Sequence, residues 1–267
     1  MPSGAQDLGT GYNNATTDSL GSIAGATGGS PQGIYEESST QEYPIGTKRE
    51  FEDGRVFRYG SFAAACNAGV LVTQDASATN IAETDGSLTA AAIGATEVIF
   101  TDSGTVGSAT ANQYAGGYLH ITDDAGEGYQ YRIKSNTAAS SNAVTFTLYD
   151  GLVVAVTTAT DIAVTGNLYN QVRTADFTQG SRVDCGAAGI TARSFTSGYY
   201  GWIQTAGVAT VLSEGVIPYG QMVAASDAVA GAVHAADQDS LEIVVGYSTM
   251  LSDDTGHVGV NLPNITT

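Results

Sequence analysis

Positively charged residues are scarce in this chain. Its 267 residues include 9 lysines and arginines against 27 aspartates and glutamates, which gives a formal net charge of −18. A field this negative repels phosphate groups, so the sequence argues against binding to DNA or RNA. The same charge suits solubility, or docking on a basic protein surface.

Cysteines and long apolar runs are also rare. Cys66 and Cys185 lie far apart, and the sequence has no Cys-x-x-Cys pair, which excludes the usual zinc and redox motifs. Each cysteine lies among small apolar residues, which favours buried free thiols over a disulfide. No apolar stretch approaches the ~20 residues of a membrane-spanning helix. The first residues lack the basic and apolar regions of a signal peptide, so we expect no membrane partner.

Motifs that carry chemistry are missing as well. Neither Gly-x-Ser-x-Gly nor a Walker-type Gly-Lys-Ser/Thr occurs, and no two of the 27 acids stand out as a glycosidase pair. His120, His234 and His257 are scattered without metal-ligand spacing, so we expect each to be structural or on the surface. The acidic turns 123–128 and 253–256 lack the order of a calcium loop. The sequence therefore predicts no enzyme, no cofactor and no metal site.

Glycine, threonine, valine and tyrosine are plentiful. The chain has 34 glycines and 14 tyrosines, and charged residues make up 13%, about half the usual share of roughly 25%. This composition favours short strands and tight turns. Only the alanine-rich stretches 61–66 and 228–236 have room for a turn or two of helix. We therefore predict an all-β fold.

Alternation of apolar and polar residues predicts strands in two regions. In residues 128–134, for example, Tyr129, Tyr131 and Ile133 fall on one face of a strand. The strands expected in the middle of the chain are 97–101, 117–122, 128–134, 144–149 and 161–165. Those expected near the C-terminus are 201–205, 210–212, 221–224, 242–247 and 258–262.

Two similar segments flank the middle region. Residues 67–76 and 218–228 both place a glycine before a short apolar strand and end in Asp-Ala. This similarity predicts two strands of one barrel that residues 86–170 interrupt. We expect a barrel domain of residues 44–85 and 171–267, with residues 86–170 as an inserted β domain.

Residues 1–43 differ from the rest of the chain. They contain eight glycines, no lysine or arginine and almost no large apolar side chains, so they cannot bury enough surface to fold alone. We expect an extended arm that becomes ordered on a neighbouring subunit or on a larger assembly. A disordered tail is the alternative.

Two groups of residues are candidates for a subunit or partner interface. The first is a basic window within residues 48–58, which holds Lys48, Arg49, Arg55 and Arg58. Arginine can hold a carboxylate through two hydrogen bonds, so we expect Arg55 and Arg58 to reach carboxylates of an adjacent copy.

The second group is Tyr199, Tyr200 and Trp202, in a stretch that holds the only tryptophan. Aromatic residues beside a glycine turn usually anchor a barrel or a subunit interface. A sugar-stacking platform is the alternative interpretation of these three side chains.

Several short segments carry a resemblance to a known family. They are residues 198–204 (GYYGWIQ), 207–212, 217–221 and 243–248, with 112–117 and 126–133 in the middle region. On these segments the chain resembles the head-decoration, or capsid cement, proteins of tailed bacteriophages, which have a small SH3-like or β-tulip barrel. The resemblance implies a non-enzymatic virion protein, made in the host cytoplasm, that binds the outside of the assembled head. It also implies a homotrimer that clamps neighbouring major capsid protein subunits.

One alternative function stays open. A head-fibre or adhesin-like protein would instead bind carbohydrate, and residues 86–170 would be its binding module. Sugar binding by that module would favour this alternative.

Overall fold

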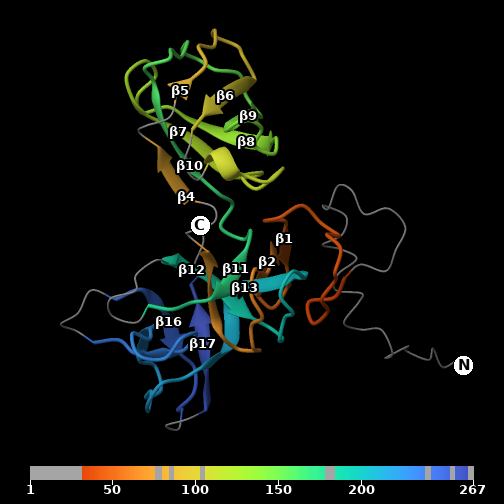
Figure 1. Ribbon diagram of the computed structural model, residues 1–267. Helices are drawn as coiled ribbons and strands as arrows, with labels where there is room; N and C mark the ends of the chain where they lie inside the picture. Colours follow the sequence, from red (N-terminus) through yellow and green to blue (C-terminus); the bar gives the residue numbers. More distant parts are fainter. Residues whose placement is uncertain are drawn as a thin grey trace, which may run out of the picture. The chain divides into compact units, whose positions relative to one another are not determined.

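The computed structural model describes residues 32–75, 80–83, 87–102, 106–177, 184–237, 242–252 and 256–263 (Figure 1). Within these ranges the protein is all-β, with two curled antiparallel sheets that form half-barrels and no α-helix. The all-β class and the barrel-type fold predicted from the sequence are therefore confirmed. The chain divides into two compact units. We call residues 1–74 with 172–267 the barrel unit, and residues 75–171 the inserted unit.

The barrel unit contains a ten-stranded sheet. Its strands are β1 (Lys48–Glu50), β2 (Val56–Ser61), β3 (Leu71–Asp75), β11 (Val172–Thr174), β12 (Asp184–Thr191), β13 (Tyr200–Leu212), β14 (Met222–Ala225), β15 (Val233–Ala235), β16 (Val244–Ser248) and β17 (His257–Leu262). The main path runs β11-β3-β12-β13-β17-β16-β14-β15, and β2 joins β13 to β1. The two similar segments found in the sequence thus supply strands β3 and β14 of the same sheet.

Strand β13 organises this sheet. Its first half pairs with β2 and β12, and its second half pairs with β17. Between the halves the register shifts at Gln204/Ala206, and Gly207 adopts a φ of 79°. A bulge of this kind bends a strand and increases its twist. The bend lets one strand serve both parts of a curled sheet.

The second part of the sheet closes into a ring. Ser213, just beyond β13, forms a bridge with Val233 of β15, and the Glu214 N–H donates to the Val233 carbonyl at 2.8 Å. Strands β13, β17, β16, β14 and β15 therefore return to their starting point. Inward-facing aliphatic side chains fill the interior, among them Leu71, Ile190, Val211, Val223, Val233, Val245, Val258, Val260 and Leu262.

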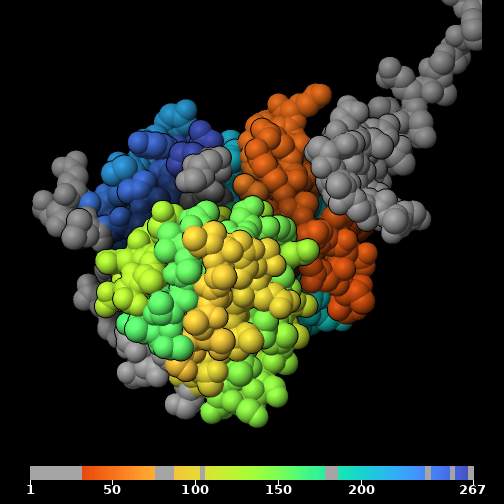
Figure 2. Space-filling view, turned by 90° about the horizontal axis from the view of Figure 1, so that it is seen from above, coloured from red at the N-terminus to blue at the C-terminus, as the bar shows by residue number. Residues whose placement is uncertain are grey.

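The inserted unit is a seven-stranded sheet with its own core (Figure 1). Its outer surface is coloured yellow to green in Figure 2. In sheet order its strands are β4 (Asn80–Glu83), β10 (Asp161–Thr165), β7 (Tyr118–Asp123), β8 (Gln130–Asn136), β9 (Ala143–Leu148), β6 (Glu97–Thr101) and β5 (Ser87–Leu88), with a short 3-10 turn at Val106–Ser108. Burial alternates along β8 as predicted, with Tyr131 and Ile133 inside and Arg132 outside. Tyr129 precedes the strand and is exposed.

The inserted unit starts earlier than the sequence suggests. It begins at Asp75 rather than at residue 86. The physical reason is that β4 forms hydrogen-bonded pairs with β10, so residues 80–83 belong to this sheet rather than to the barrel.

Candidate functional site

An aromatic cluster surrounds Trp202 in the barrel unit. The Trp202 side chain is 0% exposed, and the rings of Tyr43 and Tyr59 lie 5.3 and 5.1 Å from its ring. The Arg49 guanidinium stacks over the same ring at 5.2 Å, and Arg49 is only 2% exposed. A cation held over an indole face in this way is stabilised by the negative face of the ring.

Gln32 ties the end of the expected arm to this cluster. Its carbonyl accepts hydrogen bonds from Arg49 Nη1 at 2.9 Å and from Trp202 Nε1 at 3.1 Å. Its side-chain oxygen accepts one from the Tyr59 hydroxyl at 2.8 Å. Burial raises the pKa of Tyr59 to about 12 and lowers the pKa of Arg49.

These contacts correct two predictions. Arg49 and Trp202 face the interior of their own chain, so neither offers a surface to another subunit. Residues 32–43, expected as part of an arm that becomes ordered on a neighbouring subunit or assembly, pack on their own barrel through Gln32, Ile34 and Tyr43. The remainder of the predicted arm, residues 1–31, lies outside the described residues.

The other residues of the basic window have partners in their own chain. Lys48 pairs with Glu50 at 2.8 Å, and Arg55 Nε with Asp53 at 2.7 Å. Arg58 Nη1 donates to the Gly46 carbonyl at 3.0 Å.

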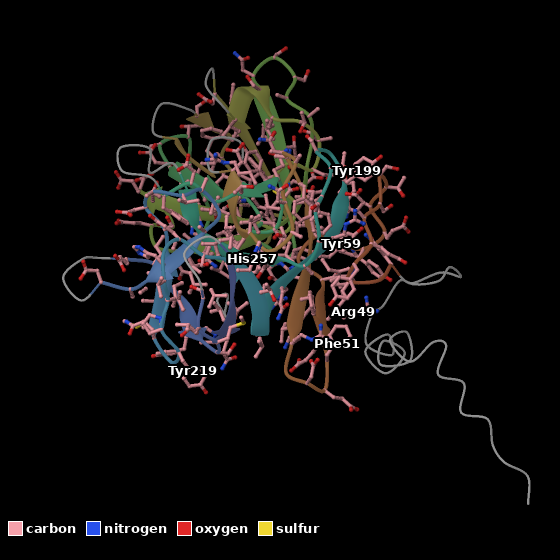
Figure 3. All side chains as sticks on the ribbon, turned by 90° about the horizontal axis from the view of Figure 1, so that it is seen from below. Arg49, Phe51, Tyr59, Tyr199, Tyr219 and His257 are labelled. Atoms are coloured by element: carbon pink, nitrogen blue, oxygen red, sulfur yellow. The ribbon has the colours of Figure 1, made fainter. Side chains whose placement is uncertain are left out.

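Tyr199 and Tyr200, from the second predicted group, are both half-buried. The Tyr200 ring stacks on the ring of Tyr59. Figure 3 shows where Arg49, Phe51, Tyr59 and Tyr199 lie in the barrel unit. The predicted interface residues thus lie in one region of the barrel unit. The centre of this region is buried packing rather than an exposed patch.

A row of exposed side chains crosses the outer face of the barrel unit. Met222 of β14 pairs with Tyr247 of β16, Tyr247 pairs with Asn261 of β17, and Asn261 pairs with Val208 of β13. Directly paired residues point to the same face of a sheet. All four are exposed, and Val208 and Tyr247 are more than half exposed.

The turn after β16 extends this apolar surface. Gly259 lies on the outer side of β17, opposite the exposed Thr210, and a side chain there would meet Thr249 and Met250. Met250 therefore covers the outer face of β17. Next to this turn, the Ser252 N–H donates to the Ile217 carbonyl and so holds the turn that carries Tyr219, which is 77% exposed (Figure 3).

We call Val208, Met222, Tyr247 and Met250 the apolar outer face. Sequence reasoning missed this surface. The signal that could have found Val208, Met222 and Tyr247 is their outward register on strands whose other residues are mostly buried. Met250 lies in the turn after β16 and has no such signal.

A groove of about 500 Å³ adjoins the apolar outer face and shares Val208 with it. Tyr35, Arg55, Gln204 and His257 also contribute to its walls. The Gln204 amide donates to the carbonyls of Ala206 and Val208, so the bulge in β13 shapes this groove. The groove is a concave feature able to receive part of a partner chain.

A third feature is a cluster of potential metal ligands. One ligand atom from each of Glu214, Asp227 and His234 lies within 4.8 Å of the others. No motif spacing connects these three residues in the sequence, because they come together only when the strands close into a ring. The other two histidines lie elsewhere: His120 contacts the Thr165 hydroxyl at 3.1 Å, and His257 lines the groove.

Of the cysteines, Cys66 is a buried free thiol, and burial raises its pKa.

Comparison with known proteins adds no relative: no family, no curated protein and no solved structure matches the chain. No helix in the described part of the chain is long and apolar enough to cross a membrane.

Proposed function

We propose that this protein is a non-catalytic virion protein that decorates the outside of a tailed-phage head and binds its major capsid protein. The observation that carries the proposal is the apolar outer face on the closed ring of strands. Clustered apolar side chains on a rigid surface are typical of protein-binding sites. The barrel-type fold agrees with the family that the glycine-rich segments resemble.

The charge distribution supports binding at this face. From Ser194 to the end of the sequence there is no lysine or arginine, so strands β13 to β17 bring no permanent positive charge to a contact. Apolar and uncharged polar surface costs little to desolvate. The acidic remainder of the protein favours a partner surface that carries positive charge.

The position of Gln32 supports a role for the arm. Because Gln32 is held by Arg49, Tyr59 and Trp202, the chain before it starts from a fixed point on the barrel. A glycine-rich segment without large apolar residues gains buried surface only from a partner. We propose that residues 1–31 contribute to attachment, and that the decorating species is a homotrimer.

Co-sedimentation tests this function directly. The purified full chain would be mixed with heads assembled from the major capsid protein of the same genome. Wild-type protein is expected to pellet with the heads, and the double variant Met222→Lys/Tyr247→Lys is expected to bind at least about tenfold more weakly, since two buried charges would lack partners. Val153→Lys, at an exposed position of the inserted unit, is the matched control and is expected to bind normally.

The free protein gives a second readout. Light scattering is expected to report three times the mass of one chain, either free or on release from the heads. Failure of the wild-type chain to pellet with any form of the heads would contradict the proposal. Equal binding by the double-lysine variant would contradict the assigned face.

One observation favours the alternative function. In the inserted unit, Arg132 pairs with the exposed Tyr118, and its guanidinium lies 4.9 Å from the centre of the exposed Tyr149 ring. Exposed aromatic rings next to a hydrogen-bond donor are suited to stacking on sugars. Binding of the full chain to a glycan array, lost in Tyr149→Ala and kept in Tyr219→Ala, would favour a carbohydrate-binding module.

A further inference from the structure

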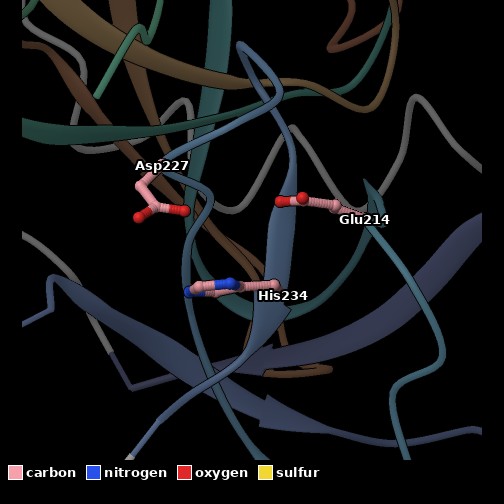
Figure 4. A group of neighbouring side chains, drawn as sticks. All are labelled: Glu214, Asp227 and His234. Atoms are coloured by element: carbon pink, nitrogen blue, oxygen red, sulfur yellow. The ribbon is translucent and has the colours of Figure 1, made fainter. Parts of the chain in front are cut away.

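The cluster of Glu214, Asp227 and His234 is built by the closure of the ring. Glu214 follows β13, Asp227 follows β14, and His234 lies in β15. The hydrogen bond from the Glu214 N–H to the Val233 carbonyl fixes Glu214 beside His234. Figure 4 shows the two carboxylates turned toward each other, with the imidazole ring beside both. Backbone pairing, rather than chance contact of surface side chains, therefore sets this geometry.

Neighbouring groups hold the three side chains in place. The Ser226 hydroxyl donates to the Glu214 carboxylate and accepts from the N–H groups of Ala228 and Val229. Ser226 thus orients Glu214 and also fixes the turn that carries Asp227. On the other side, Oε1 of Glu242 lies 3.4 Å from Nε2 of His234.

No lysine or arginine in the described part of the chain forms an ion pair with Glu214 or Asp227. His234 Nε2 is shielded from solvent and faces Glu242 Oε1 at 3.4 Å without forming a hydrogen bond. Two carboxylates held this close repel each other unless a positive charge, on the imidazole or on a bound ion, joins them.

We propose that Glu214, Asp227 and His234 bind one divalent transition-metal ion, for which Zn²⁺ is the best match. Zinc accepts both imidazole nitrogen and carboxylate oxygen at about 2.0–2.2 Å, so ligand atoms roughly 3–4 Å apart are required. The present 4.8 Å limit needs only small side-chain movements. Calcium prefers six to eight oxygen ligands, and this donor set offers fewer.

Glu242 fits the same site as an orienting group. Ligating histidines usually donate their second ring N–H to a carboxylate or carbonyl. With the ion on Nδ1, the Nε2–H of His234 faces Glu242. The ion would link the end of β13 to β15 and so lock the ring of strands, independently of what the outer face binds.

Zinc binding to the full chain, first stripped with a chelator, tests the site. Calorimetric titration with ZnCl₂ is expected to give one ion per chain, and saturation is expected to raise the unfolding temperature, because the ion binds only the folded arrangement. Titration with CaCl₂ is expected to give no comparable heat. Glu242→Gln is expected to weaken zinc binding by about 10–100-fold.

Asp227→Asn is the most informative variant, because Asp227 is exposed and its loss leaves the core intact. We expect at least about tenfold weaker binding, while Asp150→Asn, at another exposed position, binds zinc as the wild type does. His234→Gln is expected to abolish binding with an unchanged circular dichroism spectrum. No zinc binding by the wild type, or equal affinity in Asp227→Asn, would overturn the proposal.

Discussion

At the scale of single residues, Trp202 is the centre of an internal aromatic cluster. Of the two roles predicted for its stretch, anchoring the barrel or anchoring a subunit interface, the contacts of Trp202 are those of a barrel anchor. The side chains that bury it, Tyr43 and Tyr59, and the carbonyl of Gln32 come from distant parts of the chain. Local composition does not show such coverage, so the sequence left the role of Trp202 open and did not predict the burial of Arg49.

Truncation of Trp202 measures how much this cluster contributes. Trp202→Ala removes a fully buried ring and is expected to lower the free energy of unfolding by about 3–5 kcal/mol. Urea unfolding followed by circular dichroism gives this value. Tyr219→Ala, at a 77% exposed position, is the control and should change stability by less than about 0.5 kcal/mol. Equal effects of the two substitutions would contradict the packing described for Trp202.

Tyr59 predicts a pH dependence of stability. Burial raises its pKa to about 12 in the folded protein, whereas an unfolded tyrosine titrates near 10. Between these values the folded state keeps a proton that the unfolded state has lost. The free energy of unfolding contributed by Tyr59 is therefore fully present below pH 10 and falls as the pH rises toward 12.

Urea midpoints measured from pH 9 to pH 11.5 test this. Tyr59→Phe removes the titrating hydroxyl, so we expect its midpoint to fall less steeply over the range than that of the wild type. The exposed Tyr219→Phe variant should follow the wild type. Parallel curves for wild type and Tyr59→Phe would show that Tyr59 ionises normally.

At the scale of elements, the positions of several strands could be predicted from the sequence. Whether two neighbouring strand segments form one long strand could not. The predicted strands 97–101 and 161–165 coincide with β6 and β10, because regular alternation sets both ends. In contrast, 201–205 and 210–212 were predicted as two strands and form one, β13. Glycine at position 207 suggests a turn in the sequence, but here it allows a bend while pairing passes from β2 to β17.

Gly207→Ala tests this bend. Both Gly207 and Gly220 have positive φ angles, and an alanine in that conformation destabilises the folded state by about 1–2 kcal/mol. At Gly207 a Cβ would also lie 2.9 Å from the Arg55 Cα, whereas Gly220 has open space. Gly207→Ala is therefore expected to lower the free energy of unfolding by at least twice as much as Gly220→Ala. Equal losses in urea unfolding would contradict the close approach at β13.

At the scale of the whole molecule, the inserted unit connects to the barrel unit at the paired ends of β3 and β11. The chain leaves the barrel after Gln74 and returns at Val172, and these residues pair directly in β3 and β11. The similarity of residues 67–76 and 218–228 was enough to predict an insertion. Its first boundary was missed because the pairing of β4 with β10 joins segments far apart in sequence.

Excision of the insertion tests the independence of the barrel unit. Because Asp75 N–H donates to the Gln171 carbonyl at 3.1 Å, a two-residue Asn-Gly turn can replace residues 76–170. We expect the shortened chain to unfold cooperatively, with the emission of Trp202 as blue-shifted as in the full chain. Loss of cooperative unfolding would show that the barrel needs the insertion.

Electron cryomicroscopy of heads saturated with the full chain tests the central claim most directly. The account predicts trimeric density on the outer surface of the head, with Met222 and Tyr247 turned toward a protein contact. Heads without added density, or a bound barrel whose β14–β16 face points to solvent, would contradict it.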